Sequence, residues 1–368
     1  MVTNIFSKKL DSATTLFKNE QALYPDFAPS ELVGRESIIQ TLASIISPAA
    51  NGMRASNVFV YGPPGTGKTI CCKYVLSQLS EYSSKTLPIY VNCWQNDSRQ
   101  SVLSLISQKA GEVLPRRGIS SQEVFSRTLE SLWQQKKIPV IVLDEADRLF
   151  WGGEDKLLYD LARTWETSKV HSCVILVTND SELLSKADAR VRSSMIGKEI
   201  EFKAYTPLEL KKIVESRAKI ALVDGTYDSE VIALCAAAGA RANGDARVSL
   251  QALWLAARNA NEAGHSKISV DDAKKAFAAQ PTSAQIKRER DEQFLEEPEK
   301  KLISLIVEQG GSISLSKLYE AYSKKYGASE RSIRNYLRKL EFKGLLSTQS
   351  TDSNDDQSNS KKVVKVIE

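Results

Sequence analysis

The stretch YGPPGTGKT, Tyr61 to Thr69, has the form G-x-x-x-x-G-K-[ST] of a phosphate-binding loop. The residues before it, SNVFVY, are apolar and typical of a strand, and those after it, KTICCKYVLSQLSEY, carry apolar side chains at helical spacing. Strand, glycine loop and helix in this order predict an α/β core with a parallel sheet, and argue against a chance glycine-rich turn. Such loops serve kinases, pumps, motors and switches alike, so the loop alone does not say what a bound nucleotide is used for.

Each residue type in this loop suits a phosphate ligand. Without side chains, Gly65 and Gly67 let their backbone N–H groups approach the phosphates. Lys68 would meet the β- and γ-phosphates, and the Thr69 hydroxyl would ligate Mg²⁺. ATP or ADP with Mg²⁺ is therefore the expected cofactor. The loop residues predicted to bind it are Gly62, Pro63, Pro64, Gly65, Thr66, Gly67, Lys68 and Thr69.

Two further strands are expected to end in polar residues. PVIVLDEADRL, Pro139 to Leu149, is continuously apolar until its acids, as expected of a strand buried in a parallel sheet. Asp144 fits a second Mg²⁺ ligand, and Glu145 the carboxylate that orients and deprotonates the attacking water. SCVILVTND ends at Asn179, at the carboxyl edge where open α/β sheets bind ligands.

The three strand ends resemble those of the AAA+ ATPases. The resemblance implies that Asn179 is the sensor that hydrogen-bonds the lytic water or the γ-phosphate, and that ELVGRES, with Val33, packs near the adenine. It also implies a helical lid with a second sensor, an arginine that reaches the γ-phosphate. Arg247 fits because it lies in the first turn of a helix that opens at Asp245, where a cation works against the helix dipole unless an anion is near. The alternative is a surface arginine paired with Asp245.

The segment SKADARVRSSM, after the third strand, holds candidates for a residue that acts on a neighbouring subunit. In related ATPases an arginine here reaches into the neighbour's nucleotide as a finger, and Arg190 and Arg192 are both candidates. Many relatives carry the finger just after this point, where this chain has Ser193 and Ser194. The finger and ring assembly therefore stay open.

Between IYVNC and the acid-ending strand lie roughly forty residues, far more than a minimal crossover needs. They hold two helical patterns with LPRRGISS between them. The segment near 95–137, with its extra helix, resembles the insertion that marks the initiator branch of the AAA+ proteins. In that branch the extra helix touches DNA. Arg116 and Arg117 are the candidate phosphate contacts, with a pair of solvated arginines as the alternative.

The segment from Lys300 to Leu346 carries ten Lys and Arg against four Asp and Glu, a net +6 that exceeds the +5 of the whole chain. Its pattern of helix, short strand, helix, helix and closing hairpin is that of a winged helix-turn-helix. In the third helix, Ile333, Leu337 and Leu340 fall on one face for the core, and Ser329 suits the N-cap. The outward residues suited to a DNA major groove are Arg331, Ser332, Arg334, Asn335 and Arg338.

The hairpin tip departs from a typical wing. TQSTDSNDDQSNS is long and acidic and would repel phosphates, so only Lys361 and Lys362 at its base are expected wing contacts. A solvated basic face is the alternative to DNA binding, but it does not explain the element order and the hairpin.

Length and composition indicate the number of domains and the general class of the protein. With 368 residues, 42% of them hydrophobic, the chain can hold two or three domains. We place a nucleotide-binding core at 1–203, a helical lid at 204–280, and a charged linker with the winged helix at 281–368. Five scattered cysteines indicate buried free thiols, and two histidines make a histidine-based metal site improbable. Without a signal peptide or a spanning apolar run, we expect a soluble, cytoplasmic and nucleoid-associated protein without a membrane partner.

Core, insertion, lid and winged helix, in this order over nearly the whole chain, resemble the archaeal origin-recognition initiator family. Its members are related to the largest origin recognition complex subunit and to the helicase-loading cell-division-control factor. The resemblance implies binding of double-stranded origin DNA, slow ATP hydrolysis as a switch, recruitment of the replicative helicase, and paralogous initiators as partners. Two alternatives stay open: a winged-helix transcription regulator or origin-repressing paralogue, and a DNA-stimulated motor or clamp-loader-like ATPase.

Overall fold

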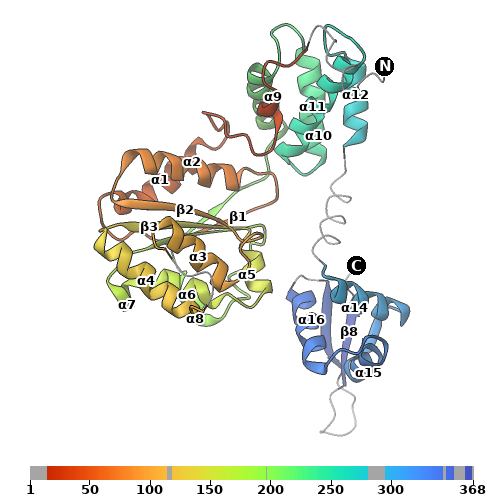
Figure 1. The fold of residues 1–368 in the computed structure, drawn as a ribbon. Helices are drawn as coiled ribbons and strands as arrows, with labels where there is room; N and C mark the ends of the chain where they lie inside the picture. The colour runs from red at the N-terminus through yellow and green to blue at the C-terminus, as the bar shows by residue number, and fades with distance from the viewer. Residues whose placement is uncertain are drawn as a thin grey trace, which may run out of the picture. The chain divides into compact units, whose positions relative to one another are not determined.

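The computed structural model describes residues 15–113, 118–195, 197–280, 295–342, 345–351 and 361–366. The chain divides into two compact units, Met1–Ile286 and Lys287–Glu368 (Figure 1). The phosphate-binding loop lies in the first unit and the basic helix face in the second. Most of the predicted charged connection between them, residues 281–294, lies outside the described residues.

A five-stranded parallel sheet in the order β2-β3-β4-β1-β5 forms the core of the first unit. Every residue of β3 and β4 is buried, which explains their continuously apolar sequences. The register places Asn92 beside Asp144 and Tyr61 beside Thr178, so the carboxyl ends of the strands meet at one edge. The strands are β1 (Val58–Tyr61), β2 (Thr86–Asn92), β3 (Ile138–Asp144), β4 (Cys173–Thr178) and β5 (Lys198–Glu201).

Helices cover both faces of this sheet. Figure 1 shows α1 and α2 over one face and α4, α6, α7 and α8 over the other. The helix α2 begins at Lys68, directly behind the glycine loop, as predicted. The helices of this layer are α1 (Glu36–Ala50), α2 (Lys68–Tyr82), α3 (Arg99–Lys109), α4 (Ser121–Gln134), α5 (Asp147–Trp151), α6 (Lys156–Ala162), α7 (Thr164–Ser168) and α8 (Ala189–Ser194).

The long crossover between β2 and β3 holds two helices, α3 and α4, which pack against each other. Each begins at a serine N-cap, Ser98 for α3 and Ser120 for α4, whose hydroxyl accepts a backbone N–H three residues on. The turn between them, with Arg116 and Arg117, lies outside the described residues.

Four helices form the lid, and the described N-terminal residues pack on it. Phe17 pairs with Leu222 in a β-bridge, and Leu16 and Leu23 belong to the lid core. Residues 1–203 are predicted to form the nucleotide-binding core, but the segment 16–27 packs against the lid. The elements are the 3-10 helix η2 (Glu20–Leu23), α9 (Pro207–Ala221), α10 (Ser229–Arg241), α11 (Ala246–Glu262) and α12 (Val270–Ala279).

The second unit has the predicted element order. Three helices pack on a three-stranded antiparallel sheet in the order β6-β8-β7. Ile333, Leu337 and Leu340 are buried in its core, as the helical spacing predicted. The elements are α14 (Glu297–Glu308), β6 (Ser312–Ser314), α15 (Leu315–Tyr326), α16 (Glu330–Phe342), β7 (Leu346–Thr351) and β8 (Lys361–Val366).

The fold tests the expectation about the cysteines. All five cysteines are free and buried, and burial raises the pKa of Cys71 to about 12, so this thiol stays protonated. Among the described residues no cluster of metal-ligating side chains occurs. Nor does any helix in the described ranges have the length and apolar character needed to cross a membrane.

Candidate functional site

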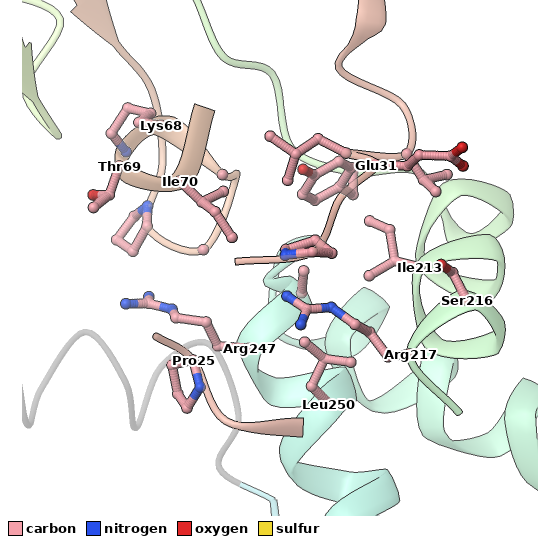
Figure 2. Close-up of a pocket in the computed structure, with 18 of the residues that line it drawn as sticks. Pro25, Glu31, Lys68, Thr69, Ile70, Ile213, Ser216, Arg217, Arg247 and Leu250 are labelled. Atoms are coloured by element: carbon pink, nitrogen blue, oxygen red, sulfur yellow. The ribbon is translucent and has the colours of Figure 1, made fainter. Parts of the chain in front are cut away.

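A cavity opens where the glycine loop, the strand ends, the N-terminal segment and the lid meet (Figure 2). The polar side is formed by the loop and by Glu145 and Asn179 from the ends of β3 and β4. Figure 2 shows Lys68 and Thr69 on one side and Ile213, Ser216, Arg217 and Leu250 of the lid on the other. The wall from the N-terminal segment consists of Pro25, Pro29, Glu31, Leu32 and Val33.

A chain of hydrogen bonds joins the loop to the two strand ends. The Nζ of Lys68 donates to Oδ1 of Asn179 at 2.9 Å, and the Nδ2 of Asn179 donates to Oε2 of Glu145 at 2.9 Å. The same ammonium donates to the carbonyl oxygens of Gly62 and Pro63, at 2.7 and 2.8 Å. The structure therefore brings together the lysine, the amide and the carboxylate that three separate sequence patterns had marked.

Asp144 is buried beneath the loop and accepts bonds from three directions. Thr69 donates its hydroxyl to Oδ2 at 2.7 Å, Tyr90 donates its phenol to the same oxygen at 2.7 Å, and the Glu145 N–H donates to Oδ1 at 3.0 Å. Burial and the charge of Asp144 raise the pKa of Tyr90, so the phenol stays a donor. A hydroxyl beside a carboxylate is the oxygen pair that suits Mg²⁺, so Thr69 and Asp144 fit that ion.

Glu145 has a backbone conformation that the sequence did not indicate. Its φ is 54°, in the left-handed region that few non-glycine residues adopt. The turn comes directly after the last residue of β3 and leaves Glu145 on the cavity wall beside Asn179. Such backbone strain persists where the surroundings hold it and is concentrated at functional sites.

The glycines of the loop have a second reason for lacking a side chain. A Cβ on Gly65 would lie 1.8 Å from Oδ1 of Asp245, and one on Gly67 would lie 2.7 Å from the Tyr205 hydroxyl. Both glycines also have positive φ, 71° and 91°. Besides leaving room for phosphates, the two glycines leave room for the lid residues Asp245 and Tyr205, which lie against them.

Arg35 was missed by the sequence analysis, although it lies within ELVGRES. Its guanidinium is buried and donates to the Thr66 carbonyl at 2.9 Å and to the Lys203 carbonyl at 2.7 Å. It also stacks on Tyr205, 3.8 Å from the ring centroid. Arg35 therefore ties the glycine loop to the first residues of the lid, a connection that no local pattern signals.

Arg217 was also missed, and it fixes the N-terminal wall. Buried on α9, it donates to the carbonyl oxygens of Ala22 and Phe27, each at 3.0 Å, and its guanidinium lies 4.8 Å from the Phe27 ring centroid. Burial lowers the pKa of Arg217 to about 10, so the side chain remains a cation at neutral pH. Trp254 adds a bond from its indole N–H to Glu20 at 2.7 Å.

Arg247 has features of both alternatives considered from the sequence, a sensor at the nucleotide site and an arginine paired with Asp245. It lines the cavity with Lys68 and Glu145, and it is also paired with Asp245. Its Nε donates to Oδ1 of Asp245 at 3.1 Å and its terminal nitrogen to Oδ2 at 2.7 Å. The anion that compensates this cation at a helix N-terminus is therefore Asp245 itself, and the dipole argument alone does not require a ligand there.

The two finger candidates lie away from this cavity. Arg190 and Arg192 are exposed on α8, and neither lines the cavity of its own chain. Arg192 donates to the Ala187 carbonyl at 3.4 Å.

The predicted DNA-reading face of α16 is exposed, and its cap is present. The Ser329 hydroxyl accepts the N–H of Ser332 at 3.2 Å, as expected of an N-cap. One of the cations is already paired, because Arg334 donates to Oε1 of Glu330 at 2.7 Å. Lys361 and Lys362 begin β8, but their side chains lie outside the described residues. The exposed or half-exposed residues of this face are Arg331, Ser332, Arg334, Asn335 and Arg338.

Comparison with known proteins gives matches over nearly the whole chain. Residues 51–185 match the model of an AAA domain, and residues 211–278 that of a Cdc6 AAA+ ATPase-type lid domain. The ORC1-type DNA replication protein 1 of Sulfurisphaera tokodaii is 33% identical over 350 residues, which cover 91% of this chain and 86% of that protein.

Solved structures of similar proteins cover the chain as fully. The structure of the Aeropyrum pernix ORC1 protein in complex with DNA is 28% identical, with a TM-score of 0.67, and the match covers 96% of this chain and 94% of that one. The ADP form of the Aeropyrum pernix ORC2 protein has a TM-score of 0.68 at 23% identity, with 95% and 94% covered. The second likeness speaks for the fold alone.

Contact between the lid and the loop predicts the effect of Gly65→Ala. An alanine at a left-handed position costs about 1 kcal/mol anywhere, but at Gly65 its Cβ would also collide with Asp245. Gly153→Ala is the matched control, because Gly153 has a φ of 73° and nothing within 4 Å of its added Cβ. Gly65→Ala should lower the melting temperature more and weaken ADP binding, measured by thermal denaturation and calorimetry. Equal effects of both variants would contradict the collision.

Proposed function

The chain belongs to the ORC1-type DNA replication protein family, and from this membership we propose that it is an ATP-switched replication initiator that binds origin DNA. The observation that carries the proposal is the match to an ORC1-type protein across 91% of the chain, which spans both the cavity of the first unit and the basic helix of the second. Recruitment of the replicative helicase and pairing with paralogous initiators extend the proposal by family resemblance.

The cavity of the first unit is the proposed ATP site. Lys68 and the loop N–H groups bind the β- and γ-phosphates, and Val33 with the N-terminal segment lies beside the adenine. Thr69 and Asp144 hold Mg²⁺, which neutralises phosphate charge when bound. Glu145 orients and deprotonates the attacking water, while Asn179 and Arg247 sense the γ-phosphate. Asn179, bonded to both Lys68 and Glu145, is placed to couple phosphate binding to the position of the catalytic carboxylate.

We favour a switch over a motor because Ser193 and Ser194 stand where many related ATPases carry the arginine finger. The lid and the N-terminal segment contribute much of its wall, so a bound nucleotide contacts both the sheet layer and the lid. Binding and slow hydrolysis then change how the lid packs on the loop. Arg190 or Arg192 would act only on a neighbour's nucleotide, if the protein assembles. A large stimulation of turnover by DNA would instead favour the motor or clamp-loader function.

The second unit is the proposed DNA-binding domain, a winged helix. Its order of helix, strand, helix, helix and two strands, with the exposed cations of α16, supports placing α16 in a major groove. The proposed contacts are Arg331, Ser332, Arg334, Asn335 and Arg338 on α16, Lys361 and Lys362 at the wing, and Arg116 and Arg117 of the inserted helices. Footprinting on origin and promoter DNA separates initiation from transcriptional control.

Two substitutions test the ATP site. Lys68→Ala removes the cation that meets the phosphates and should abolish ATP binding and hydrolysis. Glu145→Gln keeps a side chain that can bond with Asn179 but removes the base, so ATP binding should remain and hydrolysis should stall. Calorimetry and phosphate release measure the two effects. Hydrolysis by Glu145→Gln at the wild-type rate would show that another group is the base.

A cut between the two units tests whether the first unit binds ATP and the second unit binds DNA. Leu295 packs in the core of the second unit and α14 begins at Glu297, so the cut belongs between residues 286 and 287. Residues 1–286 should bind ATP normally but lose most affinity for origin DNA, since the +6 segment is removed. Electrophoretic mobility shifts with 1–286, 287–368 and the full chain measure this. Binding by 1–286 as tight as that of the full chain would move recognition to the inserted helices.

The Glu330–Arg334 pair predicts opposite effects of two substitutions on DNA affinity. Arg334→Ala should cost about 1–3 kcal/mol on a cognate site if it reads a base, or lower affinity uniformly and reduce the salt slope by about one if it contacts phosphate. Glu330→Gln removes a competing anion and should tighten binding. The matched control is Glu308→Gln, which breaks the exposed Lys325 pair of the same unit, outside α16. Fluorescence anisotropy across salt concentrations measures all three, and weaker binding by Glu330→Gln would show that the pair orients Arg334 instead.

A further inference from the structure

A buried carboxylate lies at the junction of the lid and the glycine loop. The side chain of Asp245 is 6% exposed, whereas that of its partner Arg247 is 51% exposed. Oδ1 of Asp245 accepts the backbone N–H of Arg247 at 2.9 Å, which caps α11, and both carboxylate oxygens accept the guanidinium. Among the described residues, the hydrogen bonds to the Asp245 carboxylate all come from Arg247, which is also its ion-pair partner.

Asp245 also lies directly against the loop that would bind the phosphates. A Cβ on Gly65 would meet its two oxygens at 1.8 and 2.5 Å, and the neighbouring Ala246 donates its N–H to the Gly65 carbonyl at 3.2 Å. The carboxylate is thus a fixed negative charge at the cradle. Because the carboxylate itself is buried, its charge acts on a nearby phosphate more strongly than a surface charge would.

The pair with Arg247 determines the effect of that charge. A bidentate guanidinium cancels the carboxylate, so the cradle can accept an anionic ligand. Without the guanidinium, an uncompensated buried carboxylate would remain beside the loop and would repel the phosphates of ATP and ADP alike. The loss of Arg247 would therefore have two separable consequences: a missing contact to the γ-phosphate and an unpaired, buried negative charge.

We propose that Asp245 is a positioning residue of the nucleotide site: it holds the Arg247 guanidinium at the cradle and makes nucleotide binding depend on the Asp245–Arg247 pair. The proposal rests on the ATP site described under the proposed function. It assigns Asp245 no contact with the nucleotide. It predicts that the two residues are coupled for ADP, which has no γ-phosphate for Arg247 to contact.

The test is a double-mutant cycle on the full chain, with ADP and ATP dissociation constants measured by calorimetry for wild type, Arg247→Ala, Asp245→Asn and the double variant. Asparagine keeps the N-cap and removes the charge. Arg247→Ala should weaken ADP binding by about tenfold, because it leaves the carboxylate unpaired. The double variant should regain ADP affinity to within about threefold of wild type, since the repelling charge is gone. A double variant that binds ADP no better than Arg247→Ala overturns the proposal.

The same measurements separate this inference from the proposed function. In the Asp245→Asn background the buried charge of Asp245 is gone, and Glu145 is the remaining carboxylate near Arg247. Adding Arg247→Ala there should therefore weaken ATP binding more than ADP binding, because only ATP offers the γ-phosphate contact. Equal loss for both nucleotides there would refute the sensor role of Arg247, while the rescue of ADP binding would still stand. Failure of the wild type to bind either nucleotide would refute the proposed ATP site, and this inference with it.

A second uncharged N-cap residue serves as the control for misfolding of the variants. Asp245→Ser with Arg247→Ala should rescue ADP binding in the same way, because serine also caps a helix and carries no charge. Thermal denaturation of each variant without nucleotide shows whether the lid is intact. Rescue by neither cap, in variants that melt like the wild type, would overturn the electrostatic account.

Discussion

Close approach of the lid to the phosphate-binding loop is the constraint on which the site depends. Tyr205 and Asp245 occupy the space that side chains at Gly67 and Gly65 would need. Arg35 donates to the carbonyl of Thr66 in the loop and to that of Lys203, just before the lid. Asp245, Tyr205 and Arg35 therefore pack against the loop without any ligand. A nucleotide in the proposed site would therefore bind a loop that is held by the lid residues Tyr205 and Asp245 and by Arg35 at the start of α1.

Much of the site could be predicted because its polar residues follow strong local patterns. The continuously buried β3 and β4 fix where the strands end, and parallel strand ends meet at one edge, so Asp144, Glu145 and Asn179 could be placed beside Lys68. Helical periodicity likewise gave the buried and exposed faces of α16. In these cases the signal lies within one element or in the spacing of a motif.

What could not be predicted depends on contacts between distant parts of the chain. Arg35 and Arg217 donate to backbone carbonyls. Because every residue has a backbone carbonyl, the type of the partner residue does not reveal such a contact. The packing of the N-terminal segment on the lid joins residues about two hundred positions apart, and no periodic pattern records such a pairing. The left-handed φ of Glu145 is set by the tertiary surroundings of β3, since glutamate has no preference for that region.

Arg217 holds the N-terminal segment against the lid. Its buried guanidinium has no carboxylate partner among the ion pairs of the described residues, and the carbonyls of Ala22 and Phe27 are what solvate it. Those same bonds hold Pro25 in the wall of the cavity. Because a cation cannot be left buried without partners, the segment cannot leave the lid unless Arg217 becomes hydrated. A ligand that contacts this wall would therefore stabilise the packing of the N-terminal segment on the lid by its own binding free energy.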